Sequence, residues 1–483
     1  MDFSPKSTTK KFVLNCLWRG EYGDAELFAK MFGGKVIYSH GEGWYIWNGN
    51  WELDEKNRIN NLLPLYVAAR YEAVCNDERK QVKENGDSHD INAKELNRRA
   101  KLLRSIGRIS RVLTLASGMD GMGISSDEWD ADTSKFPVKN GLIDLSTGKL
   151  LPPDANHYAK IICPTEYGGL SKKSPIFDTF LRDIFNGDDE IIAFVQRLFG
   201  YAISGKGTEH IFPILVGENG RNGKDTLLET MQYVLGDFAS PVGNEVLLSG
   251  MSNPNAATPH LVSLKGLRLA WVSETDESAR LNVNQIKLIT GGGTISARQL
   301  YSKPIKFKPT HTVMLITNFK PQANADDIAF WKRAILVNFP MEFTDNPQKP
   351  NERKIDRSLK WKLQQEASGI LAWLVNGFLM YQKEGLSIPK SVISDVEKYR
   401  DDEDAIGAFL SDNVLIFSEY EVNAAELYRE YSDWCHENGI KALTGIKFAN
   451  RIKKKYPRKR KSDGYYYSGI GLVEKSEDKE RSF

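Results

Sequence analysis

A glycine-rich loop stands between a short apolar segment and an amphipathic one. Residues 210–216 are apolar, and residues 217–224 read GENGRNGK. A buried strand, a glycine-rich turn, a lysine and then a helix are typical of a phosphate-binding loop, in which backbone N–H groups and a helix amino end surround phosphate oxygens. Lys224 would reach the β- and γ-phosphates. The residues predicted to bind the phosphates are Gly217, Gly220, Asn222, Gly223, Lys224, Asp225 and Thr226.

This loop departs from the strict pattern GxxxxGK[ST] at two positions. Glu218 stands where the pattern has glycine, and Asp225 stands where it has a hydroxyl residue. Either the Asp225 carboxylate or the Thr226 hydroxyl could ligate Mg²⁺, and the sequence leaves both open. A surface loop with a chance lysine is the alternative, but it gives no reason for the apolar strand in front.

Acidic and amide residues follow two further apolar strands. The strand 267–272 leads to Glu274 and Asp276, and the strand 312–317 leads to Asn318. A carboxylate beside a phosphate site can hold Mg²⁺ and polarise the attacking water. We expect Glu274 to be the general base and a metal ligand, with Asp276 as a second acid, and Asn318 to orient the water or sense the γ-phosphate.

An arginine begins a fourth expected strand. Arg333 precedes the apolar residues 334–337. It is a candidate for contacting a phosphate, and an ordinary salt bridge is the alternative. The predicted catalytic residues are therefore Lys224, Glu274, Asn318 and Arg333, and the predicted metal ligands are Thr226, Asp225 and Glu274.

Composition excludes several other classes of protein. The chain has 483 residues and a net charge of +2, from 65 Lys and Arg against 63 Asp and Glu. Its four cysteines form no CxxC pair, so neither a disulfide framework nor a zinc ribbon is expected, and a reduced, cytoplasmic protein fits. Neither a secretory signal nor an apolar run long enough for a membrane span is present.

The weak net charge hides a basic segment near the carboxyl end. Residues 441–461 hold ten Lys and Arg and no Asp or Glu. An amphipathic helix at 424–437 precedes a basic helix capped by Thr444, and residues 458–472 form a hairpin with a turn at 463–464. Helix, basic helix and basic wing predict a winged-helix module, whereas a solvated basic face is the alternative. The residues predicted to contact duplex DNA are Lys447, Arg451, Lys453, Lys454, Arg458, Lys459, Arg460 and Lys461.

The rest of the chain positions these sites. The expected class is a multidomain α/β protein, with aromatic strands around an Asn-Gly turn at 44–51 and helices over most of 55–117. The predicted divisions are a mixed α+β domain at 1–165, a helical collar segment at 166–205, the ATPase core at 206–345, a helical lid at 346–410, and the winged helix with a charged tail at 411–483.

The order of these motifs carries a resemblance. The loop GENGRNGK, the strand ending in Glu274 and above all residues 288–321 resemble a superfamily 3 (AAA+) DNA helicase. More narrowly, the chain resembles the phage/plasmid and poxvirus primase–helicase branch without its primase domain, with matching segments at 138–150, 195–205, 370–389 and 426–439. It is similar to replication initiator-helicases of bacterial mobile elements.

The resemblance implies roles for single residues. Lys224 matches the Walker A lysine, Glu274 the Walker B acid and Asn318 the sensor 1 asparagine. Arg333 matches an arginine finger that acts on the neighbouring subunit's ATP, which implies a homo-hexameric ring. Residues 294–308 match a hairpin that lines the ring channel, with its tip at 301–304. Tyr301 and Lys303 there suit single-stranded DNA, although Tyr301 could instead pack into the core, and Arg298 could face DNA or brace the hairpin.

The expected function is therefore an ATP- and Mg²⁺-dependent replicative DNA helicase that also binds a replication origin and travels 3′ to 5′. A separate primase or polymerase could be recruited by the N-terminal domain. An origin-binding ATPase that melts DNA without travelling is the main alternative. A protein-remodelling ATPase is a weaker one, because it gives no role to residues 441–461.

Overall fold

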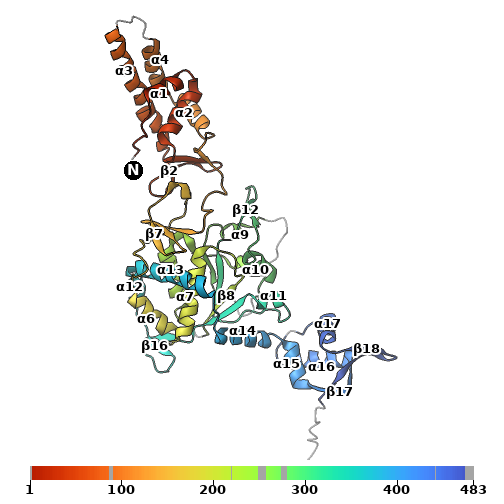
Figure 1. Cartoon of the computed structure of the whole chain (residues 1–483). Coiled ribbons are helices and arrows are strands. Elements are labelled where there is room, and N and C mark those ends of the chain that lie inside the picture. Colours follow the sequence, from red (N-terminus) through yellow and green to blue (C-terminus); the bar gives the residue numbers. More distant parts are fainter. Residues whose placement is uncertain are drawn as a thin grey trace, which may run out of the picture.

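The computed structural model describes residues 3–85, 91–218, 220–248, 257–273, 280–440 and 442–473. It is a mixed α/β protein of several parts: the N-terminal helices lie at one end, a sheet with helices around it lies in the middle, and a small module hangs beside it after α14 (Figure 1). None of the helices in the described ranges is both long and apolar enough to cross a membrane.

The N-terminal part packs five helices on one side of a small sheet of order β3-β2-β1-β4. Asp24 is fully buried and accepts hydrogen bonds from Tyr71, Arg99 and Arg108, so its charge is compensated on several sides. The aromatic strands meet at Gly49 as predicted, and this glycine has a left-handed φ of 85°. The elements are α1 (Lys10–Leu17), α2 (Gly20–Phe32), β1 (Val36–Ser39), β2 (Gly43–Trp47), β3 (Trp51–Leu53), α3 (Ala68–Asn85), α4 (Ile91–Leu102), α5 (Ile106–Ala116) and β4 (Gly123–Ile124).

A second small sheet joins this part to the middle of the molecule. Its strands are β5 (Lys135–Val138), β6 (Gly141–Asp144) and β7 (Lys149–Leu151). Phe136 and Ile143 are fully buried in the same cluster as Phe177 and Phe238 of the central part. The buried residues Phe136, Val138, Ile143 and Leu145 thus share the central hydrophobic core, although the sequence placed a boundary at 165. The predicted domain divisions themselves stay predictions.

The central sheet is entirely parallel, with strand order β14-β8-β13-β10-β9. β8 confirms the strand expected at 210–216, and every one of its residues is buried. Near-continuous apolar strands are typical of parallel sheets covered on both faces. The strands are β8 (Phe212–Val216), β9 (Ala239–Pro241), β10 (Leu269–Ser273), β13 (Thr312–Thr317) and β14 (Ala334–Asn338).

Helices and short strands surround this sheet. α7 and α13 cross closely because Gly200 and Gly377 lie at the contact, where a Cβ on Gly200 would come within 2.2 Å of the Phe378 nitrogen. α7 begins with Asp188, whose side chain accepts from the backbone of residues 190 and 191. The elements are α6 (Pro175–Ile184), α7 (Asp189–Ser204), α8 (Lys224–Leu235), α9 (Pro259–Val262), α10 (Val283–Thr290), β11 (Ile295–Ala297), β12 (Ile305–Phe307), α11 (Ile328–Trp331), β15 (Glu342–Thr344), β16 (Glu352–Lys354), α12 (Leu359–Gln365), α13 (Ala367–Glu384) and α14 (Lys390–Asp402).

The C-terminal module has a hydrophobic core of its own, in which Tyr431 stacks on Phe448 at 4.6 Å between ring centroids. The helix expected at 424–437 is confirmed. Thr444 precedes the basic helix as predicted, but its hydroxyl makes no capping hydrogen bond. Lys461 pairs with Gly464, so the turn is at 462–463 rather than 463–464. The elements are α15 (Ala405–Asn413), β17 (Val414–Asn423), α16 (Ala424–Glu437), α17 (Gly445–Lys455), β18 (Arg458–Lys461) and β19 (Gly464–Leu472), with strand order β17-β19-β18.

Candidate functional site

The loop between β8 and α8 is shaped by its glycines. Gly223 has a φ of 88°, and a Cβ there would lie 2.6 Å from Ile184, so both the backbone conformation and the space require glycine. A Cβ on Gly217 would lie 1.8 Å from the Asn222 amide nitrogen and 2.9 Å from Lys224 Nζ. Gly220 has a φ of 66°. The loop can therefore bring its backbone close to a ligand.

Lys224 lies at the centre of this site and is only 4% exposed. Its Nζ donates to Asn222 Oδ1 at 2.7 Å, to Asn318 Oδ1 at 3.1 Å and to the Gly217 carbonyl at 3.3 Å. Burial lowers the pKa of the Lys224 ammonium from its ordinary value, and the nearby Asp225 carboxylate opposes that shift. The structure thus brings together Gly217, Asn222, Lys224 and Asn318, which lie up to about 100 residues apart in the chain.

The residues of this loop fit a phosphate group. Asn222 is 3% exposed, and among the described residues its Nδ2 donor has no hydrogen-bond partner. An unsatisfied buried donor is costly, and an anionic oxygen would satisfy it. At the start of α8, Asp225 is exposed and Thr226 is half-buried. Both remain candidates for a metal ligand.

The predicted acidic residues Glu274 and Asp276 lie outside the described residues. β10 ends directly before them at Ser273, which is in register with Ile316 on β13. Asn318 comes two residues after Ile316. The carboxyl ends of β8, β10 and β13 therefore meet at one edge of the sheet, the edge where ligands bind in open parallel sheets.

Arg333 lies at the opposite end of the sheet, where the amino ends of the parallel strands meet. Its carbonyl accepts a hydrogen bond from Phe212 at the beginning of β8, while Lys224 follows the end of that strand. The five steps from residue 212 to residue 217 span roughly 17 Å at about 3.3 Å per step. Arg333 Nη1 donates to the Ala329 carbonyl at 2.7 Å, and its buried Nε has no hydrogen-bond partner in the part of the chain that the structure describes.

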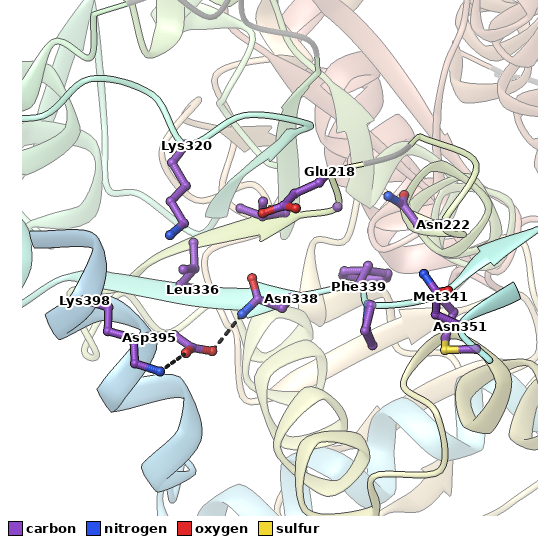
Figure 2. Close-up of a pocket in the computed structure, with 13 residues that line it drawn as sticks. Glu218, Asn222, Lys320, Leu336, Asn338, Phe339, Met341, Asn351, Asp395 and Lys398 are labelled. Carbon is purple, nitrogen blue, oxygen red and sulfur yellow. Dashed lines mark hydrogen bonds and ion pairs between the residues drawn. The ribbon is translucent and has the colours of Figure 1, made fainter. Parts of the chain in front are cut away.

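A cavity of about 320 Å³ adjoins the loop (Figure 2). Asn338 on its floor donates to Asp395 at 2.7 Å, and Lys398 lies 3.8 Å from the same carboxylate. Lys320 lies on the same side of the cavity as Asp395 and Lys398, across from Asn222 (Figure 2). The lining residues are Val216, Gly217, Glu218, Asn222, Lys320, Leu336, Asn338, Phe339, Pro340, Met341, Asn351, Asp395 and Lys398. Sequence reasoning missed most of them. Lys320, two residues after Asn318, carried a local signal, whereas Asp395 and Lys398 reach the site only through the packing of α14 on the sheet.

The hairpin expected at 294–308 is present but shorter than predicted. β11 and β12 pair over only three residues each. The reason is that Arg298 forms hydrogen bonds with Thr258 through both its N–H and its carbonyl, which removes it from the ladder. Ile295 and Ala297 anchor the base in the core.

The tip of this hairpin is fully open to solvent. Tyr301 is completely exposed and has a left-handed φ of 59°, so it does not pack into the core. Lys303 is exposed beside it. The hairpin projects away from the body of the central part (Figure 1).

The predicted duplex-contacting residues divide into three groups. Lys447, Lys453 and Lys454 are exposed on α17. On the hairpin, Lys459 and Lys461 both lie beside Glu421, and the Arg458 guanidinium lies 3.7 Å from the centre of the Tyr465 ring. Arg460 lies farther from the same ring, at 6.0 Å.

Arg451 differs from the other predicted duplex contacts. Its guanidinium contacts Asp326 and Asn324 of the central part, and its side chain is only 15% exposed. The structure therefore does not present Arg451 on the open face of α17, because its guanidinium is paired with Asp326 outside the module.

Comparison with known proteins gives matches to three segments of the chain. A family model described as "D5 N terminal like" matches residues 25–186, a "Family of unknown function (DUF5906)" matches 215–333, and "Poxvirus D5 protein-like" matches 401–472. The second match contains Lys224, Asn318 and Arg333. The third contains the basic helix α17.

The curated relatives that match include viral proteins. "Putative helicase L207/L206" of Acanthamoeba polyphaga mimivirus is 28% identical over 324 residues, which are 64% of this chain and 34% of the relative. "Primase D5" of Fowlpox virus is 24% identical over 253 residues, 49% of this chain and 31% of the relative. The chain thus spans about a third of the length of these relatives.

A solved structure of the NrS-1 C terminal region covers 90% of this chain and 96% of its own, at 11% identity and a TM-score of 0.43. The sequence matches are the more informative comparison. The chain is similar to viral proteins named helicase or primase, and its D5-like matches cover residues 25–186 and 401–472, the second of which includes the basic helix α17.

Proposed function

We propose that this protein is an ATP- and Mg²⁺-dependent DNA helicase of replication, of the superfamily 3 type, and that its C-terminal module recognises a replication origin. The observation that carries the proposal is the contact of Lys224 Nζ with Asn318 Oδ1 and the Gly217 carbonyl at the carboxyl ends of parallel strands. This contact joins the glycine-rich loop to an amide on the adjacent strand, as a nucleotide-hydrolysing site requires.

The architecture supports this class. In the order β14-β8-β13-β10-β9, strand β8 leads into the glycine-rich loop. It lies between β14, the last strand of this sheet in the sequence, and β13, which ends directly before Asn318. This is the arrangement of an AAA+ core. The module of α15, α16, α17 and a basic hairpin has the composition of a winged helix, with α17 as the helix offered to the major groove.

ATP would be held mainly by the loop. Lys224, the Asn222 donor and the backbone of residues 217–224 would bind its phosphates, and the neighbouring cavity would take its ribose and base. Mg²⁺ would be held by Asp225 or Thr226 with Glu274, and it would neutralise charge that develops on the phosphates. Asn318 would position the attacking water, and Glu274 would accept its proton.

Arg333 would serve a neighbouring subunit. It lies at the far edge of the sheet from its own Lys224, so within one chain it has no route to the same phosphates. In a ring, Arg333 of each subunit could reach the nucleotide bound at Lys224 of the next subunit. We propose that this ring is a homo-hexamer. Such arginines contribute roughly 10³–10⁵ in rate in related phosphoryl transfer.

The hairpin tips would grip the DNA inside this ring. Lys303 supplies a cation for phosphate and Tyr301 an aromatic face for a base or sugar, and both are open to solvent. Hydrolysis at the subunit interfaces would move the hairpins along one strand in the 3′ to 5′ direction. The names of the viral relatives support a replication function, and the N-terminal part could recruit a separate primase or polymerase.

Strand displacement on forked DNA tests the proposal. Forks with a single 3′ or a single 5′ tail are incubated with ATP and either the wild-type protein or Lys224→Ala. Unwinding of the 3′-tailed fork by the wild type alone is the expected result. Hydrolysis of ATP stimulated by DNA, without displacement of either fork, would contradict the helicase and favour an ATPase that melts the origin without travelling.

A further inference from the structure

One face of the basic helix α17 is bound to the central part of the same chain. Arg451 forms an ion pair with Asp326 through Nε, and its Nη2 donates to Asn324 Oδ1 at 3.1 Å. Its Nη1 also lies 3.7 Å from Asp404 Oδ1, and Lys455 Nζ lies 3.8 Å from the second oxygen of that carboxylate. Asp326 of the central part and Asp404, which directly precedes α15, thus face two basic side chains of α17.

Arg451 lies on the side of α17 opposite to the exposed Lys453. Arg451 and Lys455 are four residues apart and therefore lie on one side of the helix. Lys453 lies two positions from Arg451, roughly 200° around the axis at about 100° per residue, and it is exposed. Docking through Arg451 consequently leaves the side with Lys453 available to another ligand.

The segment that receives α17 is tied to the ATPase machinery. It runs from Pro321 to Trp331, and it therefore lies between Asn318 and Arg333 in the chain. Asp327 in this segment forms an ion pair with Lys287 of α10 at 2.7 Å, and α10 leads into the hairpin. From the opposite side, the Ala323 N–H donates to Glu403 at 2.9 Å. The segment is therefore held by α10, by the end of α14 and by α17 at once.

We propose that Asp326 is the docking site for α17 on the central part, with Asp404 beside it at the start of α15, and that this contact couples the C-terminal module to the segment between Asn318 and Arg333. Arg451 is then a docking residue and not a contact to DNA. The coupling rests on the proposed function: duplex DNA held on the open side of α17 would alter the rate of ATP hydrolysis through this segment. The docking itself does not depend on that function.

The first test measures docking without any ligand. Fluorescent donor and acceptor dyes are attached at Glu437→Cys in α16 and Lys383→Cys in α13, both exposed positions. We expect Asp326→Arg and Arg451→Asp each to lower the energy transfer, and the double variant Asp326→Arg/Arg451→Asp to restore it. Asp326→Asn, which removes only a charge, should lower it less.

A matched control separates docking from DNA binding. Lys453→Asp reverses a charge on the same helix but on its open side. It should weaken binding to a duplex while leaving the energy transfer unchanged. Arg451→Asp should instead lower the energy transfer while leaving duplex binding unchanged. The docking site would be overturned if Asp326→Arg and Arg451→Asp both left the energy transfer unchanged. It would also be overturned if the double variant Asp326→Arg/Arg451→Asp failed to restore the energy transfer.

The second test measures coupling as the ratio of ATP hydrolysis rates with and without duplex DNA. We expect this ratio to fall toward one in Asp326→Arg and to recover in the double variant. A ratio that stays at the wild-type value in Asp326→Arg, although the energy transfer is lost, would overturn the coupling. If the wild type hydrolyses no ATP under any condition, the proposed function fails, and the energy-transfer result still decides the docking site.

Discussion

The glycine-rich loop and the basic helix α17 were both recognised by basic residues in a pattern, and they differ in what the structure does with those residues. Lys224 meets oxygens of the predicted Gly217, Asn222 and Asn318. Arg451 instead contacts Asp326 and Asp404, and the sequence around Arg451 does not predict these partners. A local motif fixes the neighbours of a lysine at the start of a helix, whereas a charged residue on a surface helix takes its partners from whatever part of the chain packs nearby.

Burial also separates the two regions. The Lys224 side chain is enclosed by the loop, and burial lowers the pKa of its ammonium. Lys453 and Lys454 on α17 are exposed. A buried cation interacts strongly with a ligand that excludes water, while exposed lysines attract phosphates through longer-range charge that salt screens. Variants in the two regions should therefore differ both in size of effect and in salt dependence.

The largest effect is expected from Lys224→Ala. It removes the ammonium from the centre of the loop, so ATP hydrolysis should fall to background, while binding of a duplex by the C-terminal module should persist. Steady-state hydrolysis and duplex affinity measure the two regions separately. Lys265→Ala, an exposed lysine away from the loop, is the control and should behave as wild type. Loss of both activities in Lys224→Ala would mean that the two regions are not independent.

Arg333→Ala should lower hydrolysis by roughly 10³–10⁵, because the arginine would stabilise charge on the neighbouring subunit's phosphates. Mixing it with Lys224→Ala protein should restore part of the activity, since some interfaces then combine an intact loop with an intact arginine. Rates measured over a series of mixing ratios test this. Lys332→Ala, one residue away and exposed, is the control. Absence of rescue at every ratio would argue against action between subunits.

Tyr301→Ala should weaken binding of single-stranded DNA by about 1–3 kcal/mol, the usual contribution of one stacked base. Lys303→Ala should weaken it as well, and more strongly at low salt. Fluorescence anisotropy with a labelled oligonucleotide measures both variants. Lys306→Ala places the same charge change on strand β12, away from the tip, and should have a smaller effect. Equal effects at 303 and 306 would indicate general attraction and not a gripping tip.

The smallest effect is expected on α17. The slope of log affinity for duplex DNA against log salt is negative. Lys453→Ala and Lys454→Ala should each reduce the magnitude of this slope by about 1, because one phosphate contact is lost. Arg451→Ala should leave that slope unchanged, since its guanidinium is paired with Asp326. Titrations at several salt concentrations provide the slopes. A fall at Arg451 equal to that at Lys453 would remove the distinction between the two sides of the helix.

The sequence predicted the features that depend on neighbouring residues. The strands at 212–216 and 312–317, the helix at 424–437 and the turn at Gly49 follow from local apolar period and turn chemistry, and the structure has them. Parallel strands also place Gly217 and Asn318 at one edge, which explains why Lys224 meets them.

Features that depend on distant packing were missed. The hairpin strands are shorter because Thr258 competes for the backbone of Arg298. Asp395 and Lys398 line the cavity only because α14 packs beside β14. Residues 136–145 join the central core because their aromatic and aliphatic side chains meet those of α6 and of residues near 238, which no local pattern specifies.

The most direct test of the account is the rate of ATP hydrolysis as a function of single-stranded DNA concentration, for the wild type and for Tyr301→Ala/Lys303→Ala. The account predicts that DNA accelerates hydrolysis by the wild type, that Lys224→Ala hydrolyses no ATP at any DNA concentration, and that the hairpin double variant hydrolyses ATP without responding to DNA. Equal acceleration in the wild type and the double variant would contradict a hairpin that couples the nucleotide site to DNA, and absence of hydrolysis in the wild type would contradict the nucleotide site itself.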